Sequence, residues 1–468
     1  MIVKTIPSSW IIEDEHRLDC GPFLKGSYEA KKVLEKLPVV KDHLSDLTHD
    51  GISGIYHVGQ DKIVWATDLQ HGMPFLRSAD ILKLDFSGQP LISRKQVAGN
   101  KLFQCPYGST LITRSGTIGK MVYMREDLAD TAISQDVLKV VPDPNRVQSG
   151  YLFAFLRSKF GLPIVVGGTF GSVIVHIEAE NIADLPVPRL GKVEDEAHSL
   201  VEQAASELTE SINLMENATQ QLLDCAGLSE SINSDFLSDS RRLGWSEKVS
   251  SLYSLRALNF DPRSKALEES VLAIRHDLLG ELVDRSNFEG HIVFKRIDAS
   301  PEYGVMLVGQ REAFQIRPEG RWISKKSVEG LGLEVPAGTT VIPCHGTLGE
   351  SELYCRATLV TERTSQYAYS GDFYRCIPKE GVIASGYLFA FLRSRFAFRM
   401  IRAMSTGSKQ QYQHPVLMAN MPVPRLDAEK EQEIASMVDR AAYLRDHALD
   451  FEDQAIALVE RTIEEGGR

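Results

Sequence analysis

Hydrophobic positions follow two alternating patterns along this chain, and each pattern occurs twice. From about residue 52 to 141, short β-branched and aromatic runs are separated by Gly and Pro, which predicts the strands of a curled sheet. Residues 150–160, GYLFAFLRSKF, then predict a buried helix closed by Gly161 and Pro163. The same eleven residues return 236 positions later, at 386–396, with a single change from Lys159 to Arg395. Because this offset is about half of the 468 residues, we interpret the chain as two copies of one unit.

Each copy is followed by a stretch in which apolar residues recur at alternating steps of three and four. The first seam consists of Val201, Ala205, Leu208, Ile212, Met215, Thr219, Leu222 and Ala226, and the second of Ile434, Met437, Ala441, Leu444, Ala448, Phe451, Ala455 and Leu458. This spacing predicts two coiled-coil helices of about 35 residues, each roughly 50 Å long. At the offset of 236, Val201 falls on Met437, so we expect the two seams to be in register. We expect the helices to pair antiparallel; two unrelated amphipathic helices on separate cores are the alternative.

Composition places the chain among ordinary globular proteins. Its 43% hydrophobic and 25% charged residues are typical values, and no apolar run approaches the roughly 18 residues of a membrane span. The N-terminal residues lack a signal-peptide pattern, so we expect a cytoplasmic protein. The six cysteines form no CxxC pair, which favours reduced thiols over a disulfide or zinc framework.

The net charge of −11 is unevenly distributed. Residues 191–240 hold eleven acidic residues and one lysine, and residues 426–468 hold twelve acidic and five basic residues. The rest of the chain therefore carries a net charge of +6. Since a polyanion responds to local charge, the acidic total does not exclude nucleic acid as a partner.

The two β-rich segments differ much more than the helices around them. Residues 290–378 share with 50–141 only a Gly-Thr-Ile-Gly or Gly-Thr-Leu-Gly turn, at 116–119 and 346–349, and a following Ser-Gln pair. Each copy ends in a similar hexapeptide, LPVPRL at 185–190 and MPVPRL at 421–426. A common frame with one divergent insert per copy is typical of two recognition domains for different targets.

These features together resemble the specificity (S) subunits of Type I restriction–modification systems. The β-rich domain with its GTIG/GTLG turn, the GYLFAFLRS helix and the VPRL exit carry the resemblance, and it covers essentially the whole chain. The first copy departs from the family pattern, because RLGKVEDE lacks the Glu-Gln-Glu-Ile helix start of 431–434. The resemblance implies a cytoplasmic subunit in phage defence that binds a split site in double-stranded DNA. Its implied partners are DNA adenine methyltransferase subunits and, where the system cleaves DNA, a translocase/nuclease subunit.

The resemblance also implies a fold and a domain order. We expect an α+β fold in which two pseudo-two-fold-related β-rich target recognition domains are separated by two long antiparallel coiled-coil helices. The expected segments are target recognition domain 1 at 1–190, spacer helix 1 at 191–232, a linker with target recognition domain 2 at 233–425, and spacer helix 2 at 426–468.

The residues that contact DNA are expected among basic, amide and aromatic side chains near turns of the β-rich domains. Such side chains can bond guanine, adenine or phosphate. The candidates are Arg94, Lys95, Lys101, Arg114 and Lys120 in the first copy, and Arg321, Lys325, Lys326, Lys409, Gln411 and Tyr412 in the second. Trp65 and Trp322 are expected in the core rather than as stacking platforms.

Motifs for catalysis and metal binding do not emerge from the sequence. The segment 115–120, SGTIGK, lacks the glycine spacing of a phosphate loop, and the histidines, His345 among them, look isolated. We therefore expect no catalytic residue, no metal site and no cofactor in this chain, with S-adenosylmethionine bound by the partner methyltransferase. Two alternatives remain: a non-DNA coiled-coil scaffold joining two similar domains in a larger assembly, and a stand-alone enzyme with its active site in the β-rich domains.

Overall fold

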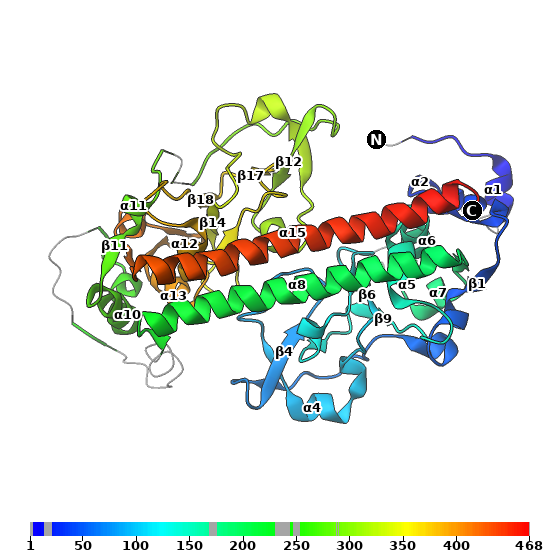
Figure 1. Ribbon diagram of the computed structural model, residues 1–468, viewed down its shortest axis with the longest axis horizontal. Coiled ribbons are helices and arrows are strands. Elements are labelled where there is room, and N and C mark those ends of the chain that lie inside the picture. The colour runs from blue at the N-terminus through cyan, green and yellow to red at the C-terminus, as the bar shows by residue number, and fades with distance from the viewer. Residues whose placement is uncertain are drawn as a thin grey trace. The chain divides into compact units, whose positions relative to one another are not determined.

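The computed structural model describes residues 3–13, 21–167, 176–229, 244–246, 253–286, 288 and 290–467 (Figure 1). Most of the predicted linker at the start of the 233–425 segment lies outside these residues. The chain forms two compact units, Met1–Thr209 with His447–Arg468, and Glu210–Asp446. The boundary between units 1 and 2 falls inside both long helices, so each unit contains part of each helix. Each unit is described by itself.

The described strands of unit 1 form two four-stranded sheets and one two-stranded pair. In the first sheet the order is β2 (Ile55–Tyr56), β9 (Val137–Val140), β6 (Thr110–Thr113) and β7 (Met121–Tyr123), and all neighbours are antiparallel. In the second sheet it is β3 (Trp65–Ala66), β5 (Leu91–Ser93), β4 (Gly72–Leu76) and β8 (Ala132–Ile133), where β4 and β8 are parallel. The pair consists of β1 (Lys41–His43) and β10 (Pro186–Pro188).

The described strands of unit 2 form three three-stranded sheets and one two-stranded pair. One sheet has the order β16 (Thr358–Leu359), β14 (Thr340–Pro343) and β18 (Phe373–Cys376), and another β13 (Arg321–Ser324), β12 (Gly304–Val308) and β17 (Ala368–Tyr369). A third contains β15 (His345–Gly346), β20 (Gln411–Gln413) and β19 (Ser405–Gly407). The edge pair is β11 (His276–Leu278) with β21 (Pro422–Pro424).

The strand pairing shows that the divergent β-rich segments share one topology, which the sequence comparison missed. Gly72 lies opposite Ser93 in the β4–β5 ladder, and Gly304 lies opposite Ser324 in the β12–β13 ladder. The inner strand of each pair then makes a parallel ladder, β4 with β8 and β12 with β17. Strands β4, β5 and β8 of unit 1 therefore correspond to β12, β13 and β17 of unit 2, beyond the short sequence island that we predicted to be shared.

The repeated helix is the centre of each core. Apart from Ser149, Arg157 and Ser385, every residue of α5 (Ser149–Arg157) and α12 (Ser385–Leu392) is buried, as predicted. Gly150 and Gly386 allow this helix to lie against a long helix, because a Cβ on them would be 2.8 Å from His198 Cα and 2.6 Å from the Ala435 carbonyl oxygen. The short helices around these cores are α1 (Ser8–Glu13), α2 (Gly21–Leu24), α3 (Ser27–Lys36), α4 (Arg94–Gly99), α6 (Gly161–Gly167), α7 (Ala179–Ile182), α10 (Pro262–Leu272), α11 (Leu279–Leu282), α13 (Arg395–Ala403) and α14 (Pro415–Ala419).

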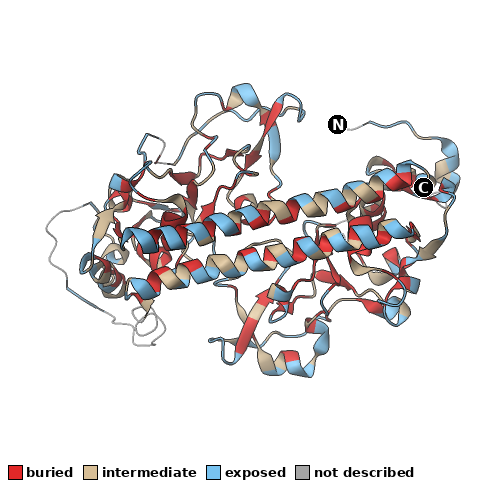
Figure 2. Cartoon of the chain, viewed as in Figure 1, coloured by how far each residue is buried: buried red, intermediate tan, exposed pale blue. Residues whose placement is uncertain are grey.

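The two long helices, α8 (Lys192–Cys225) and α15 (Ala428–Glu464), alternate buried and exposed residues along their length (Figure 2). Their buried stripes contain Ala197, Val201, Ala204, Leu208, Ser211, Ala218 and Leu222, and Ile434, Val438, Ala441, Arg445, Ala448, Ala455 and Val459. The three-four spacing is confirmed, but corresponding residues are 237 rather than 236 positions apart. One extra residue before Glu431 causes the shift, so Val201 corresponds to Val438 and the predicted match with Met437 is wrong.

Within unit 1 the two helices run antiparallel. Ala197, near the start of α8, shares a hydrophobic core with Ile463, near the end of α15. Further along α8, Glu207 Oε2 lies 2.7 Å from the ring nitrogen Nδ1 of His447. Residue numbers therefore rise along one helix as they fall along the other.

The same direction is found within unit 2. The Ser211 hydroxyl donates a hydrogen bond of 2.7 Å to the carbonyl oxygen of Ala441, and Leu222 shares a core with Ile434. The predicted α+β class, with two similar β-rich units and antiparallel long helices, is confirmed.

Candidate nucleic-acid interface

The structure brings four of the predicted basic residues to equivalent positions in the two units. In unit 1, β5 ends at Ser93 and is followed at once by Arg94 and Lys95 of α4. In unit 2, β13 ends at Ser324 and is followed by Lys325 and Lys326 of the short 3-10 helix η7 (Lys325–Ser327). We call each pair the basic turn of its unit.

Backbone hydrogen bonds place the two basic turns in the same way. Ser93 N donates to the carbonyl oxygen of Val64, and Ser324 N donates to that of Ile297, both at 2.8 Å. The next amide, at Arg94 or Lys325, donates to a carbonyl oxygen of the loop before the inner strand, at His71 or Tyr303. The sequences Ile92-Ser-Arg-Lys and Ile323-Ser-Lys-Lys are therefore equivalent, although their offset differs from that of the flanking helices.

Three of these four side chains are exposed. Lys95, Lys325 and Lys326 are open to solvent, and so is Lys101 of the 3-10 helix η3 (Lys101–Phe103), which follows α4. Ammonium groups held on short helical turns at the end of a strand can reach phosphate oxygens as point charges.

Arginine–aspartate pairs lie beside both basic turns. Arg94 Nη1 and Nη2 donate to the two carboxylate oxygens of Asp130 at 2.7 and 2.6 Å, and Arg321 is held by Asp298 in the same two-point manner. Each carboxylate raises the pKa of its arginine, and each guanidinium lowers the pKa of the aspartate. Either arginine would have to leave its aspartate before it could bond a base edge.

Two tryptophans that we expected in the core are exposed instead. Trp65 is 51% exposed on β3, where it lies opposite Ile92, and Trp322 is 36% exposed on β13. Trp65 contacts the ring of Phe75 edge-on, with 5.7 Å between the ring centroids. Both strands are short and lie at the edge of their sheet, so one side of each indole faces solvent. An exposed indole next to a cationic turn can stack on a base.

Two other candidates have structural roles in this fold. Arg114 is buried, and its guanidinium donates to the carbonyl oxygens of Ile177 and Gln135 and to the carboxylate of Glu178. Gln411 is also buried and bonds the side chain of Arg256 and the carbonyl oxygen of Ser408. Burial removed these side chains from the surface, which the sequence alone did not indicate. Lys120 is half-buried in a hollow that it lines with Leu162, Pro163 and Val166.

The hairpin of β19 and β20 in unit 2 carries the remaining candidates. Lys409 is exposed in the turn, and Tyr412 is exposed on β20. Gly407 has a φ of 90° and its Cβ position is 2.4 Å from the carbonyl oxygen of Gln410, so this tight turn requires glycine. Tyr412 pairs with His345 across the β15–β20 ladder.

Sequence reasoning missed a pair of buried cations. Lys139 on β9 and Arg375 on β18 are equivalent residues, 236 positions apart, and both are fully buried. Arg375 donates to the carbonyl oxygens of Phe373, Tyr369 and Ser370. Burial lowers the pKa of Lys139 to about 8, and its ammonium lies 5.4 Å from the ring centroid of Tyr56. The repeat offset alone would have aligned the two residues, but it would not have shown that they are buried.

No protein-family model matches this sequence, and no curated protein matches it. The solved structures to which the chain is similar include the following three, and each similarity covers 92% of this chain. One is the S subunit of a Type I restriction–modification system from M. genitalium, at 13% identity, a TM-score of 0.32 and 96% coverage of that chain. The second is the HsdS subunit from Thermoanaerobacter tengcongensis, at 12% identity, a TM-score of 0.26 and 97% coverage. The third, from work on complex assembly and conformational transition of the type I R-M system, has 12% identity, a TM-score of 0.26 and 98% coverage. Within the described part of the chain, no helix has the length and apolar character needed to cross a membrane.

Proposed function

We propose that this chain is a sequence-specific subunit that binds double-stranded DNA and directs partner adenine methyltransferase subunits to a bipartite site. The observation that carries the proposal is the basic turn, which recurs at the same place in two units whose β-rich sequences otherwise differ. A common position supplies the same contact to the DNA backbone in both units, and different surroundings supply different base preferences.

The rest of the surface is consistent with this division of labour. The acidic residues are concentrated in 191–240 and 426–468, which include both long helices, while the remainder of the chain is net positive. Acidic helix faces repel phosphate and suit a basic partner protein. In this proposal the helices bind the methyltransferase subunits, S-adenosylmethionine belongs to those subunits, and a translocase/nuclease subunit joins where the system cleaves DNA.

The proposal is tested by the salt dependence of duplex binding. The full chain, alone and with its methyltransferase partner, is titrated with labelled duplex DNA at several salt concentrations. Replacing Lys325 and Lys326 by alanine removes two phosphate contacts. The negative slope of log Kobs against log salt should therefore become shallower by about 2. The double substitution of Lys31 and Lys36, exposed on α3, removes the same charge away from the basic turns and should leave the slope unchanged.

The alternative functions give different outcomes in the same experiment. A scaffold that does not use DNA would bind no duplex even at low salt, with or without the partner. An unchanged slope in the Lys325/Lys326 variant would remove the basic turn of unit 2 from the interface. Turnover by the isolated chain would favour a stand-alone enzyme.

A further inference from the structure

Three potential metal ligands come together in unit 2 from separate segments of the chain. They are His291, which precedes β12, His345 on β15 and Asp372, which precedes β18, and their ligand atoms all lie within 4.8 Å of one another. His345 Nδ1 is 3.7 Å from Asp372 Oδ1, and the two imidazole rings have centroids 5.0 Å apart. Among the described residues, no other group of three or more potential metal ligands comes this close together. The histidine that looked isolated in the sequence therefore has two neighbours of the right kind.

The backbone holds each of the three residues in place. The carbonyl oxygen of Asp372 accepts hydrogen bonds from Cys344 N and Gln310 Nε2 at 2.9 and 3.0 Å. The chain at His291 passes so close to residue 371 that a Cβ on Gly371 would lie 1.9 Å from the Ile292 carbonyl oxygen. His291 itself has a φ of 75°, a conformation that is costly for a residue with a side chain and that tends to persist at functional sites.

The ring of His345 is oriented by a neighbour. Its Nδ1, the nitrogen that faces Asp372, also lies 3.0 Å from the sulfur of the buried Cys344.

The equivalent place in unit 1 is filled differently. Thr113 and Pro343 end equivalent strands, opposite Val137 and Phe373, so Ser115 corresponds to His345 and Asp136 to Asp372. The Ser115 hydroxyl donates to Asp136 at 2.9 Å.

Unit 1 also has a permanently charged side chain next to Ser115, the guanidinium of Arg114. Arg114, the counterpart of Cys344, places its guanidinium there and pairs with Glu178. Unit 2 has a thiol in place of that guanidinium and an imidazole in place of the hydroxyl.

We infer that His291, His345 and Asp372 bind one divalent transition-metal ion of the zinc class. Two imidazole nitrogens and a carboxylate oxygen suit Zn²⁺, and three protein ligands leave one position of a tetrahedral ion for solvent. The ion does in unit 2 what Arg114 does in unit 1, because it supplies positive charge where the strands end. It also joins three segments that are far apart in the sequence, and it anchors β15, which pairs with the strand that carries Tyr412.

The test is a metal titration of the full chain after removal of bound metal with a chelator. The wild-type chain should bind one Co²⁺ or Zn²⁺ per molecule, and Zn²⁺ should raise the thermal midpoint of unfolding. His345→Gln and Asp372→Asn should each weaken binding at least tenfold and abolish the shift in midpoint. His49→Gln, which changes an exposed histidine paired with Asp50 in unit 1, should leave both unchanged.

Folding of the variants is checked from their metal-free unfolding curves. If His345→Gln does not fold, His291→Asn serves as the second variant, because that side chain is exposed. The inference is overturned if the wild-type chain binds no stoichiometric metal, or if the ligand variants that fold bind it as tightly as the wild type.

Discussion

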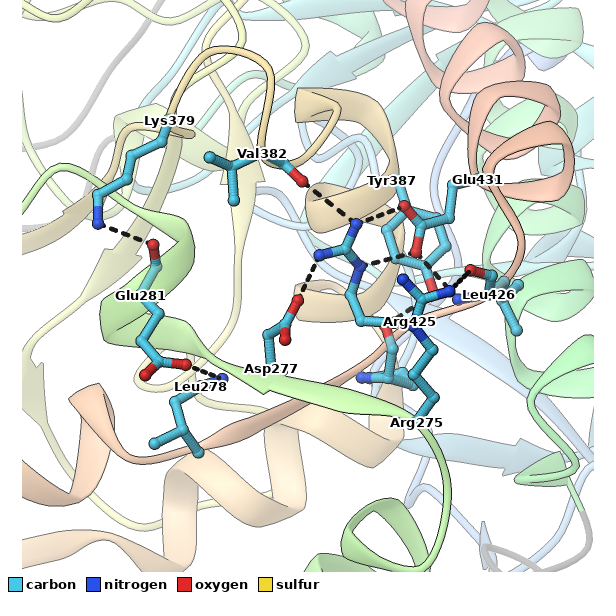
Figure 3. A network of polar contacts seen from close by, with 11 residues as sticks. Arg275, Asp277, Leu278, Glu281, Lys379, Val382, Tyr387, Arg425, Leu426 and Glu431 are labelled. Atoms are coloured by element: carbon cyan, nitrogen blue, oxygen red, sulfur yellow. Dashed lines mark hydrogen bonds and ion pairs between the residues drawn. The ribbon is translucent and has the colours of Figure 1, made fainter.

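Glu431 accepts hydrogen bonds from Arg425 Nε and Nη2 at 2.8 and 2.9 Å, and this two-point ion pair lies where the last strand of unit 2 meets α15 (Figure 3). One of its oxygens also accepts the backbone amide of Leu426 at 2.9 Å. Arg425 in turn bonds Asp277 of the edge strand β11. In unit 1, Glu194 bonds Arg189 and the amide of Leu190 in the same way. Each long helix is therefore tied at its first turn to the strand that leads into it.

Replacing Glu431 by glutamine should destabilise the start of α15. Glu431 is buried, and the substitution leaves Asp277 as the one carboxylate that we described on the Arg425 guanidinium, at a cost of about 2 kcal/mol. Hydrogen exchange at the first turn of α15 should become faster by the corresponding factor of about 30. The control is Glu433→Gln, an exposed acidic residue half a turn further along, and equal effects of both substitutions would contradict this role.

Replacing Lys139 by methionine should stabilise unit 1 at neutral pH by about 2 kcal/mol. Among the described residues, none accepts a hydrogen bond from its ammonium, which is fully buried. Burial lowers the pKa of Lys139 from 10.5 to about 8. At a pH between 8 and 10.5, the lysine is therefore protonated in the unfolded chain and neutral in the folded chain. Wild-type stability should therefore rise from pH 8 to about 10.5, by up to about 3 kcal/mol, and this rise should be absent in Lys139→Met.

The equivalent substitution in unit 2 supplies the control for that experiment. Arg375→Met removes a guanidinium that satisfies three backbone carbonyl oxygens, so it should destabilise unit 2 by about 3 kcal/mol. Chemical denaturation of both variants at pH 7 and pH 10 measures the signs. Destabilisation by Lys139→Met at pH 7 would show that its burial is not costly.

Replacing Asp130 by asparagine should strengthen DNA binding. Asp130 holds both terminal nitrogens of Arg94 and places a negative charge beside the basic turn of unit 1. Its removal frees the guanidinium and should tighten duplex binding roughly fivefold at low salt, which corresponds to ~1 kcal/mol. Asp46→Asn changes an exposed acid elsewhere in unit 1 and is the control. Weaker binding by the Asp130 variant would instead mean that the ion pair is part of the binding-competent surface.

The sequence predicted the frame of this molecule well because the frame depends on local patterns. Ten identities in GYLFAFLRS(K/R)F and the three-four spacing of two acidic stretches were sufficient for two units and two long helices. The register of those helices was one residue off, since an insertion before Glu431 leaves the seam pattern intact while shifting its numbering.

The candidate interface was predicted less completely because it depends on non-local pairing. Nothing in the isolated runs indicates that Arg94 and Lys325 follow equivalent strands, because their offset differs from 236. Arg114 and Gln411 are buried in the fold, whereas Lys95 and Lys326 are exposed, and this difference is not visible in the sequence. The exposure of the two tryptophans is not visible there either. The grouping of His345 with His291 and Asp372 likewise arises only when three distant segments meet.

Methylome sequencing shows directly whether this chain determines which DNA sequence is methylated. A host would carry this chain with its neighbouring adenine methyltransferase, in wild-type form and with alanine at Arg94 and Lys95 or at Lys325 and Lys326. We expect a split adenine-methylated motif whose sequence is the same in both variants but whose methylated fraction falls, because the basic turns contact the DNA backbone rather than the bases. Methylation that is independent of this chain, or that is as complete in both variants as in the wild type, would contradict a subunit that binds DNA through the basic turns of two units.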